Sequence, residues 1–137
     1  MLLLPGCPEK RRLAKEAIQL VWRMENGKEV TRTPRGIKVD IYDNDVSDIP
    51  IETIGRTATN IPVDNKGTAL KVMGLEALII AKHRAKRPAR PQDDQDLLEL
   101  ARTKYDKINW DLLRSVATKS EVEFETIRVT MGAFRNI

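Results

Sequence analysis

Apolar positions recur along the chain with two different periods, and these periods predict the elements of the fold. Over 36–42 apolar and polar residues alternate, with Ile37, Val39 and Ile41 on one face, which is typical of a half-buried strand. Strands are also predicted at three further segments: 1–4, 28–33 and 67–73. Together these segments predict a small sheet.

A helical spacing of apolar residues predicts the remaining elements. The segment 8–25 has this spacing, and Asn26-Gly27 suits a left-handed helix end, so we expect an amphipathic helix there. Ser120 followed by Glu123 is a capping-box pattern, which supports a helix at the end of the chain. Helices are predicted at 51–58, 75–86, 92–104, 109–117 and 120–134.

The order of these elements predicts the fold class. Strands and helices alternate over 1–73, whereas 74–137 is helical throughout. We therefore expect one α/β (α+β) domain over 1–137, with a small mixed sheet of about three to four strands backed by helices and a C-terminal helical section. A chain of 137 residues is long enough for one such core.

Composition limits the cellular compartment and the kinds of partner that the protein can have. The single cysteine, Cys7, excludes an internal disulfide framework and favours a reducing, cytoplasmic compartment. No apolar run is long enough to span a membrane, and the opening MLLL is too short to be a signal peptide. The net charge of +4 permits an anionic partner such as a nucleotide or nucleic acid without requiring one.

The most specific pattern lies over 70–100. A strand-like LKVM is followed by a glycine, an apolar helix with a basic end, a proline-containing turn and a helix with early aspartates. This order resembles the distal half of small nucleotidyltransferase-superfamily domains, in the branch of abortive-infection toxins and minimal nucleotidyltransferases. The resemblance covers 36–113. It implies transfer of a nucleoside monophosphate from an NTP to a hydroxyl acceptor, with Mg²⁺ and the NTP as cofactors.

The resemblance assigns roles to particular residues of this pattern. Lys82 matches the family's helix-terminal lysine, and Arg87 or Arg90 matches the arginine that follows it, so these three residues are candidates for nucleotide binding. Asp93 and Asp96 match the aspartates of the next helix, for which we expect a structural role.

Asp40 is the candidate catalytic and metal-binding residue. In the resembled superfamily, carboxylates on neighbouring strands hold two divalent ions, which is the logic of two-metal phosphoryl transfer. Two of these carboxylates come from an Asp-x-Asp pair, and the third lies on a later strand that IKVDIY matches at Asp40. The residue pattern by itself favours a surface aspartate over a metal ligand.

The upstream motifs of that superfamily are not found in the chain. There is no Gly-Ser pair for a phosphate-cradling loop, and the one strand-adjacent Asp-x-Asp, at Asp43 and Asp45, follows Asp40 instead of preceding it. The resemblance implies that MLLL is the end of the strand that carries the pair. We therefore expect an N-terminally truncated domain that is inactive as these 137 residues, which leaves its status as an enzyme open.

The densest group of cations in the sequence supports two interpretations. They lie together around a helix end: Lys82, His83, Arg84, Lys86, Arg87 and Arg90. They could bridge to Asp93 and Asp96 across the turn, or they could bind phosphate groups. The alternative function is thus a non-catalytic binding or regulatory module that contacts nucleic acid or a protein partner through this 82–90 surface.

The truncation also suggests an oligomer. Missing upstream strands would leave an exposed sheet edge, and a second copy of the chain could pair with it. We therefore expect a homodimer through the sheet edge.

Overall fold

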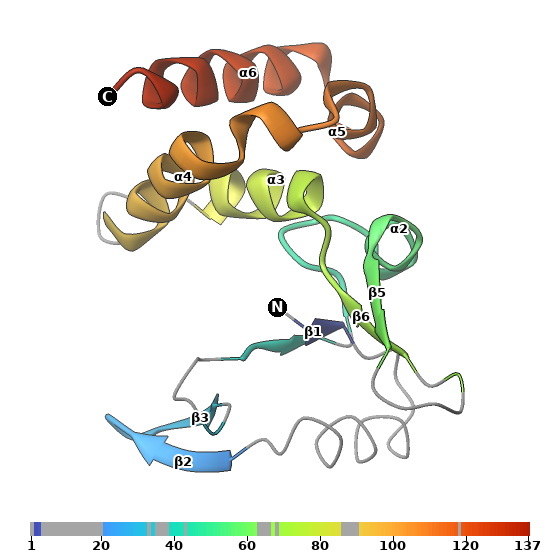
Figure 1. Cartoon of the computed structure of the whole chain (residues 1–137), viewed down its shortest axis with the longest axis vertical. Coiled ribbons are helices and arrows are strands. Elements are labelled where there is room, and N and C mark those ends of the chain that lie inside the picture. The colour runs from blue at the N-terminus through green and yellow to red at the C-terminus, as the bar shows by residue number, and fades with distance from the viewer. Residues whose placement is uncertain are drawn as a thin grey trace. The chain divides into compact units, whose positions relative to one another are not determined.

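The computed structural model of the chain forms two compact units. The first comprises Met1–Asp45 with Pro50–Met73, and the second comprises Val46–Ile49 with Gly74–Ile137. Figure 1 shows the course of the chain. The residues that the structure describes are 2–3, 21–32, 34, 39–42, 44–62, 67, 69–85, 91–117 and 119–137.

The first unit contains a four-stranded mixed sheet of order β4-β1-β6-β5. β1 pairs in parallel with β4 and antiparallel with β6, which in turn pairs antiparallel with β5. Figure 1 shows β5 and β6 as the long arms of this sheet. The small mixed sheet and the helical C-terminal section confirm the predicted α+β class. The strands are β1 (Leu2–Leu3), β4 (Ile41–Tyr42), β5 (Thr59–Pro62) and β6 (Ala69–Val72).

A hairpin replaces the end of the predicted helix over 8–25. β2 (Val21–Glu25) pairs antiparallel with β3 (Lys28–Arg32), so the helix prediction is wrong for the last residues of its range. Asn26 and Gly27 have φ of 53° and 76°, the left-handed values of a two-residue turn whose twist matches paired strands. Asn-Gly therefore closes a hairpin here instead of capping a helix. Residues 8–20 lie outside the described residues.

The strand predicted over 36–42 is described only in part, because 35–38 lie outside the described residues. Of residues 39–42, Ile41–Tyr42 is a strand and 39–40 are not. Val39 donates its N–H to the carbonyl of Thr31 at 2.8 Å, so the chain follows the hairpin before it joins the sheet. Asp40 consequently lies immediately before β4 and not within a long strand.

The remaining part of the first unit contains one predicted and one unpredicted element. α2 (Ile51–Thr57) lies within the helix predicted over 51–58, and its Ile54 is fully buried. Asp45 accepts a hydrogen bond from the N–H of Ile51 at 3.0 Å, which satisfies one of the unpaired donors at the helix start. β5 was not predicted because all of its residues are exposed and it has no buried face that would produce alternation.

The second unit is helical, and its helices agree with the prediction to within about two residues, the usual uncertainty of helix ends. Its core is aliphatic, with Ile79, Ile80, Leu97, Leu113 and Met131 almost completely buried. In the part of the chain that is described, no helix has the length and apolar character that crossing a membrane requires. The elements are α3 (Leu75–Ala85), α4 (Pro91–Lys104), η1 (Tyr105–Lys107), α5 (Trp110–Val116) and α6 (Glu121–Arg135).

A chain of aromatic rings links three of these helical elements. Trp110 packs edge-to-face against Tyr105 and Phe124, with ring centroids 5.7 and 6.4 Å apart. The guanidinium of Arg114 lies over the ring of Phe124, and that of Arg135 lies over the ring of Tyr105. This cluster holds η1, α5 and α6 together.

Candidate functional site

Asp40 is exposed and lies at the start of β4. In the parallel pairing of β1 and β4, Leu2 lies opposite Ile41, so Asp40 is one residue upstream of the first paired position. Its carboxylate is therefore at the end of β4 where the two parallel strands begin, and it is accessible to a ligand from solvent.

The described residues do not by themselves form a complete metal site. Among them, no three His, Cys, Asp or Glu side chains gather closely enough to hold a metal ion. Asp43 lies outside the described residues, and Asp45 accepts the hydrogen bond from the start of α2. Within the described residues, the carboxylates around Asp40 are too few to hold two divalent ions.

Lys82 is engaged by both aspartates of the following helix. Its Nζ lies 2.8 Å from Asp96 Oδ2 and 3.6 Å from Asp93 Oδ1. Burial acts to lower the pKa of Lys82, but the hydrogen bond and charge of Asp96, with those of Asp93, outweigh it and raise the pKa above its usual value. The side chain of Asp93 is only 2% exposed, so this bridge lies at the contact between α3 and α4.

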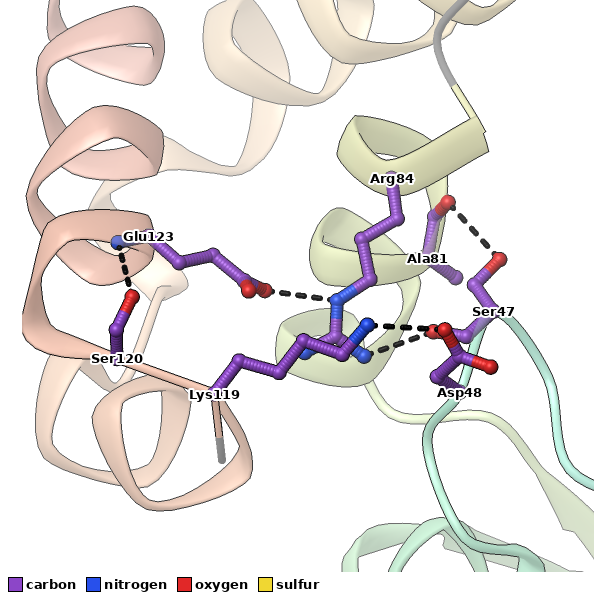
Figure 2. Close-up of polar contacts among 7 residues, drawn as sticks. All are labelled: Ser47, Asp48, Ala81, Arg84, Lys119, Ser120 and Glu123. Carbon is purple, nitrogen blue, oxygen red and sulfur yellow. Dashed lines mark hydrogen bonds and ion pairs between the residues drawn. The ribbon is translucent and has the colours of Figure 1, made fainter.

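Arg84 is an internal residue and not part of an exposed basic surface. Its Nε lies 2.7 Å from Glu123 Oε1, and its NH1 donates to the carbonyl of Ser47 at 2.7 Å. Figure 2 shows Arg84 of α3 between Glu123 of α6 and the turn that contains Ser47. The Arg84 side chain is 11% exposed, which corrects its expected place among the phosphate-binding cations of the 82–90 surface.

This correction bears on the alternative function. Among the described residues of this surface, Lys82 is paired with Asp93 and Asp96, and Arg84 is paired with Glu123. The side chain of His83 is half-buried. Arg87 and Arg90 lie outside the described residues, so a nucleic-acid or protein partner on this surface remains a prediction that depends on 86–90.

The turn over 46–49 is anchored to the helices of the second unit. Val46 and Ile49 exchange backbone hydrogen bonds, and Ser47 and Asp48 have φ of 49° and 62°. Ser47 Oγ donates to the carbonyl of Ala81 at 3.4 Å, a long bond. Lys119 Nζ lies 2.9 Å from Asp48 Oδ2. Figure 2 marks this ion pair. The hydrogen bond and charge of Lys119 lower the pKa of Asp48.

Glu76 is a buried carboxylate that the sequence pattern does not single out. Glu76 of α3 is 7% exposed, and its Oε1 accepts a hydrogen bond from the backbone N–H of Asn109 at 2.9 Å. Asn109 in turn caps α5 by accepting from the N–H of Leu112. The glutamate therefore fixes the start of α5 against α3. The position of Glu76 in the first turn of a helix is visible in the sequence. Its contact with Asn109 is not, because the two residues are 33 positions apart.

The structure thus combines an α+β fold with an exposed aspartate at the start of the edge strand β4. A family model described as "Nucleotidyl transferase of unknown function (DUF2204)" matches residues 23–131. Because this match covers most of the chain, the protein belongs to that family. No curated protein and no solved structure matches the chain significantly.

Proposed function

We propose that the protein acts in nucleotidyl transfer, moving a nucleoside monophosphate from an NTP to a hydroxyl acceptor. The observation that carries this proposal is the family match over residues 23–131. The exposed position of Asp40 supports its role as one of the carboxylates that hold Mg²⁺ for this reaction.

The strand pairing supports the arrangement of the site. β1 and β4 are parallel neighbours, and neighbouring strands lie about 4.8 Å apart. Carboxylates at equivalent positions on such strands are close enough to share metal ions that lie about 3.5–4 Å from one another. The proposal assigns the Asp-x-Asp pair to residues that precede Leu2 along the line of β1, beside Asp40.

The cofactors of this function are also part of the proposal. Mg²⁺ would neutralise the charge of the NTP phosphates when bound. Of the three residues that the resemblance suggests for nucleotide binding, Arg87 and Arg90 stay proposals. Lys82 is already paired with Asp93 and Asp96, so the proposal gives it no contact with the nucleotide.

One experiment tests this function. The 137-residue chain is compared with the native protein purified from its own cells, whose intact mass and N-terminal peptide are determined. Both receive Mg²⁺ and, in turn, each common NTP labelled at its α-phosphate. We expect transfer of label by a native protein that carries the Asp-x-Asp pair, and no efficient transfer by the 137 residues alone.

The outcomes separate two claims. Transfer by the 137-residue chain that depends on Asp40 would overturn only the expectation that this chain is inactive. A native protein that begins at Met1 and transfers no label would overturn the proposed function itself.

A further inference from the structure

The turn over 46–49 is a part of the helical unit that comes from the N-terminal half of the chain. Its neighbours in the sequence, Asp45 and Pro50, both belong to the first unit. Within the turn, Val46 is 8% exposed and Ile49 is fully buried. A four-residue segment that leaves the first unit and returns to it thus completes the packing of the helices.

The tip of this turn is held by two cations. Arg84 NH1 donates to the carbonyl of Ser47 at 2.7 Å, and Lys119 Nζ lies 2.9 Å from Asp48 Oδ2. Arg84 is itself fixed by its ion pair with Glu123, which is largely removed from water. Figure 2 shows Ser47 and Asp48 facing these two cations. The turn is therefore attached through buried apolar groups at its base and polar groups at its tip.

The backbone of the turn depends on these contacts. Ser47 and Asp48 both have a left-handed φ, of 49° and 62°, and backbone hydrogen bonds between Val46 and Ile49 close the turn. Two successive residues of this kind form a tight turn that favours Asn-Gly, the pair found at 26–27. Neither serine nor aspartate has the conformational freedom of glycine. The contacts with the helices thus stabilise a conformation that the local sequence does not favour.

The strand β4 needs support from the chain on either side of it. It has two residues, lies at an edge of the described sheet and pairs there with β1, which also has two residues. So short a pairing is not stable by itself. On the upstream side, the hydrogen bond from Val39 to Thr31 fixes the chain. On the downstream side, only 43–45 separate Tyr42 from the attached turn.

We infer that the 46–49 turn is a strap that keeps β4, and with it Asp40, in register with β1. Its attachment to the helices limits how far the downstream end of β4 can move. Asp40 directly precedes β4, so release of this strand displaces the carboxylate. Ile49 is then a positioning residue for Asp40. The role of Asp40 in transfer rests on the proposed function, whereas the link between the turn and β4 does not.

Hydrogen exchange of the β4 amides in the 137-residue chain tests this link by NMR. Ile49→Ala removes most of a fully buried side chain that holds the turn. We expect it to accelerate exchange at Ile41 and Tyr42 by about 30-fold or more, because opening of β4 then requires less free energy. The matched control is Ile61→Ala, the same change at a 46% exposed residue of β5. It should leave the β4 amides unchanged.

A milder variant covers the case in which Ile49→Ala does not fold, which circular dichroism shows. Lys119→Met removes the exposed partner of Asp48 and leaves the buried side chains in place. If β4 opens together with the turn, Lys119→Met accelerates exchange at Tyr42 and at Ile49 by the same factor. Faster exchange at Ile49 with no change at Tyr42 would overturn the inference, as would β4 amides that exchange at the unprotected rate in the wild type.

The consequence for Asp40 is tested in the native protein that carries the Asp-x-Asp pair. We expect Ile49→Ala to lower kcat for transfer by about tenfold or more and to leave KM for the NTP unchanged, since Ile49 is buried and only the carboxylate is displaced. Ile61→Ala should change neither constant. An unchanged kcat despite faster exchange at β4 would overturn the positioning of Asp40. Absence of transfer by the wild type would instead contradict the proposed function, and the exchange result would still decide whether the turn holds β4.

Discussion

Arg84 and Glu123 are separated by 39 residues in the sequence, yet their side chains form an ion pair with a 2.7 Å contact between Nε and Oε1. Both side chains are largely removed from water, at 11% and 16% exposed. The pair joins α3 to α6, and Arg84 also binds the carbonyl of Ser47. It therefore adds a polar link between two helices to the aliphatic core of the helical unit.

Loss of one partner from this pair should be costly. We expect Arg84→Ala to lower the free energy of unfolding by about 3 kcal/mol, because Glu123 would keep its charge in a poorly hydrated position. The control is Arg128→Ala, which removes an arginine that is 52% exposed and paired with Glu125, and which should change the free energy of unfolding much less than Arg84→Ala does. Urea denaturation measures both. Equal effects would show that Arg84 is not a structural residue.

Lys82 should give the stability a dependence on alkaline pH. Its pKa is raised in the folded state, so its contribution is fully present below the usual lysine value of 10.5 and is lost as the pH rises through the raised value. We expect Lys82→Met to be less stable than the wild type by about 1–2 kcal/mol at neutral pH. The difference should vanish at pH values above the raised pKa. Urea denaturation of both proteins across this range measures it, and a pH-independent difference would contradict the expectation.

Two glycines should respond in opposite directions to alanine. Gly27 has a φ of 76°, and a Cβ there would meet no atom within 4 Å, so Gly27→Ala tests backbone conformation alone. We expect it to destabilise the β2–β3 hairpin by about 1–2 kcal/mol. Gly55→Ala, within α2, should stabilise that helix by about 0.5–1 kcal/mol. Hydrogen exchange of the hairpin and helix amides measures each effect, and a stabilising Gly27→Ala would contradict the turn geometry.

The turn over 46–49 should contain relievable strain at Asp48. Its φ of 62° is a value that glycine adopts freely and aspartate does not. We expect Asp48→Gly to be more stable than Asp48→Ala by about 1 kcal/mol, since both variants lose the ion pair with Lys119 and differ only at this φ. Thermal denaturation compares the two. Equal stabilities would mean that the turn is not strained.

The sequence predicted the helical unit well and the strands less well, for physical reasons. In the helices from Leu75 onward, the helical spacing of apolar residues is clear, and so are the helix ends. One such end is the cap at Ser120, whose hydroxyl accepts a hydrogen bond from the N–H of Glu123 at 3.2 Å. The segment 21–25 is short, so its apolar residues fit both a helix and a strand. Asn26-Gly27 also fits both, and pairing with β3 decides between them.

Contacts in the candidate site between residues close in the sequence could be predicted, whereas contacts between remote residues could not. The contact of Lys82 with Asp93 and Asp96 could be inferred because only a short proline-containing turn separates α3 from α4. Arg84 could not be separated from its basic neighbours, since Glu123 and Ser47 are remote in the sequence. Such long-range pairs depend on the tertiary packing of the helices and leave no periodic signal.

The most direct test of the proposed function is the rate of NMP transfer by the native protein and its Asp40→Asn variant, with α-phosphate-labelled NTP and Mg²⁺. The control is Glu52→Gln, which neutralises another exposed carboxylate of the first unit. We expect Asp40→Asn to lower the rate by about a hundredfold or more, and Glu52→Gln to have no effect. Transfer at the wild-type rate by Asp40→Asn would contradict the assignment of Asp40 to the metal-binding carboxylates.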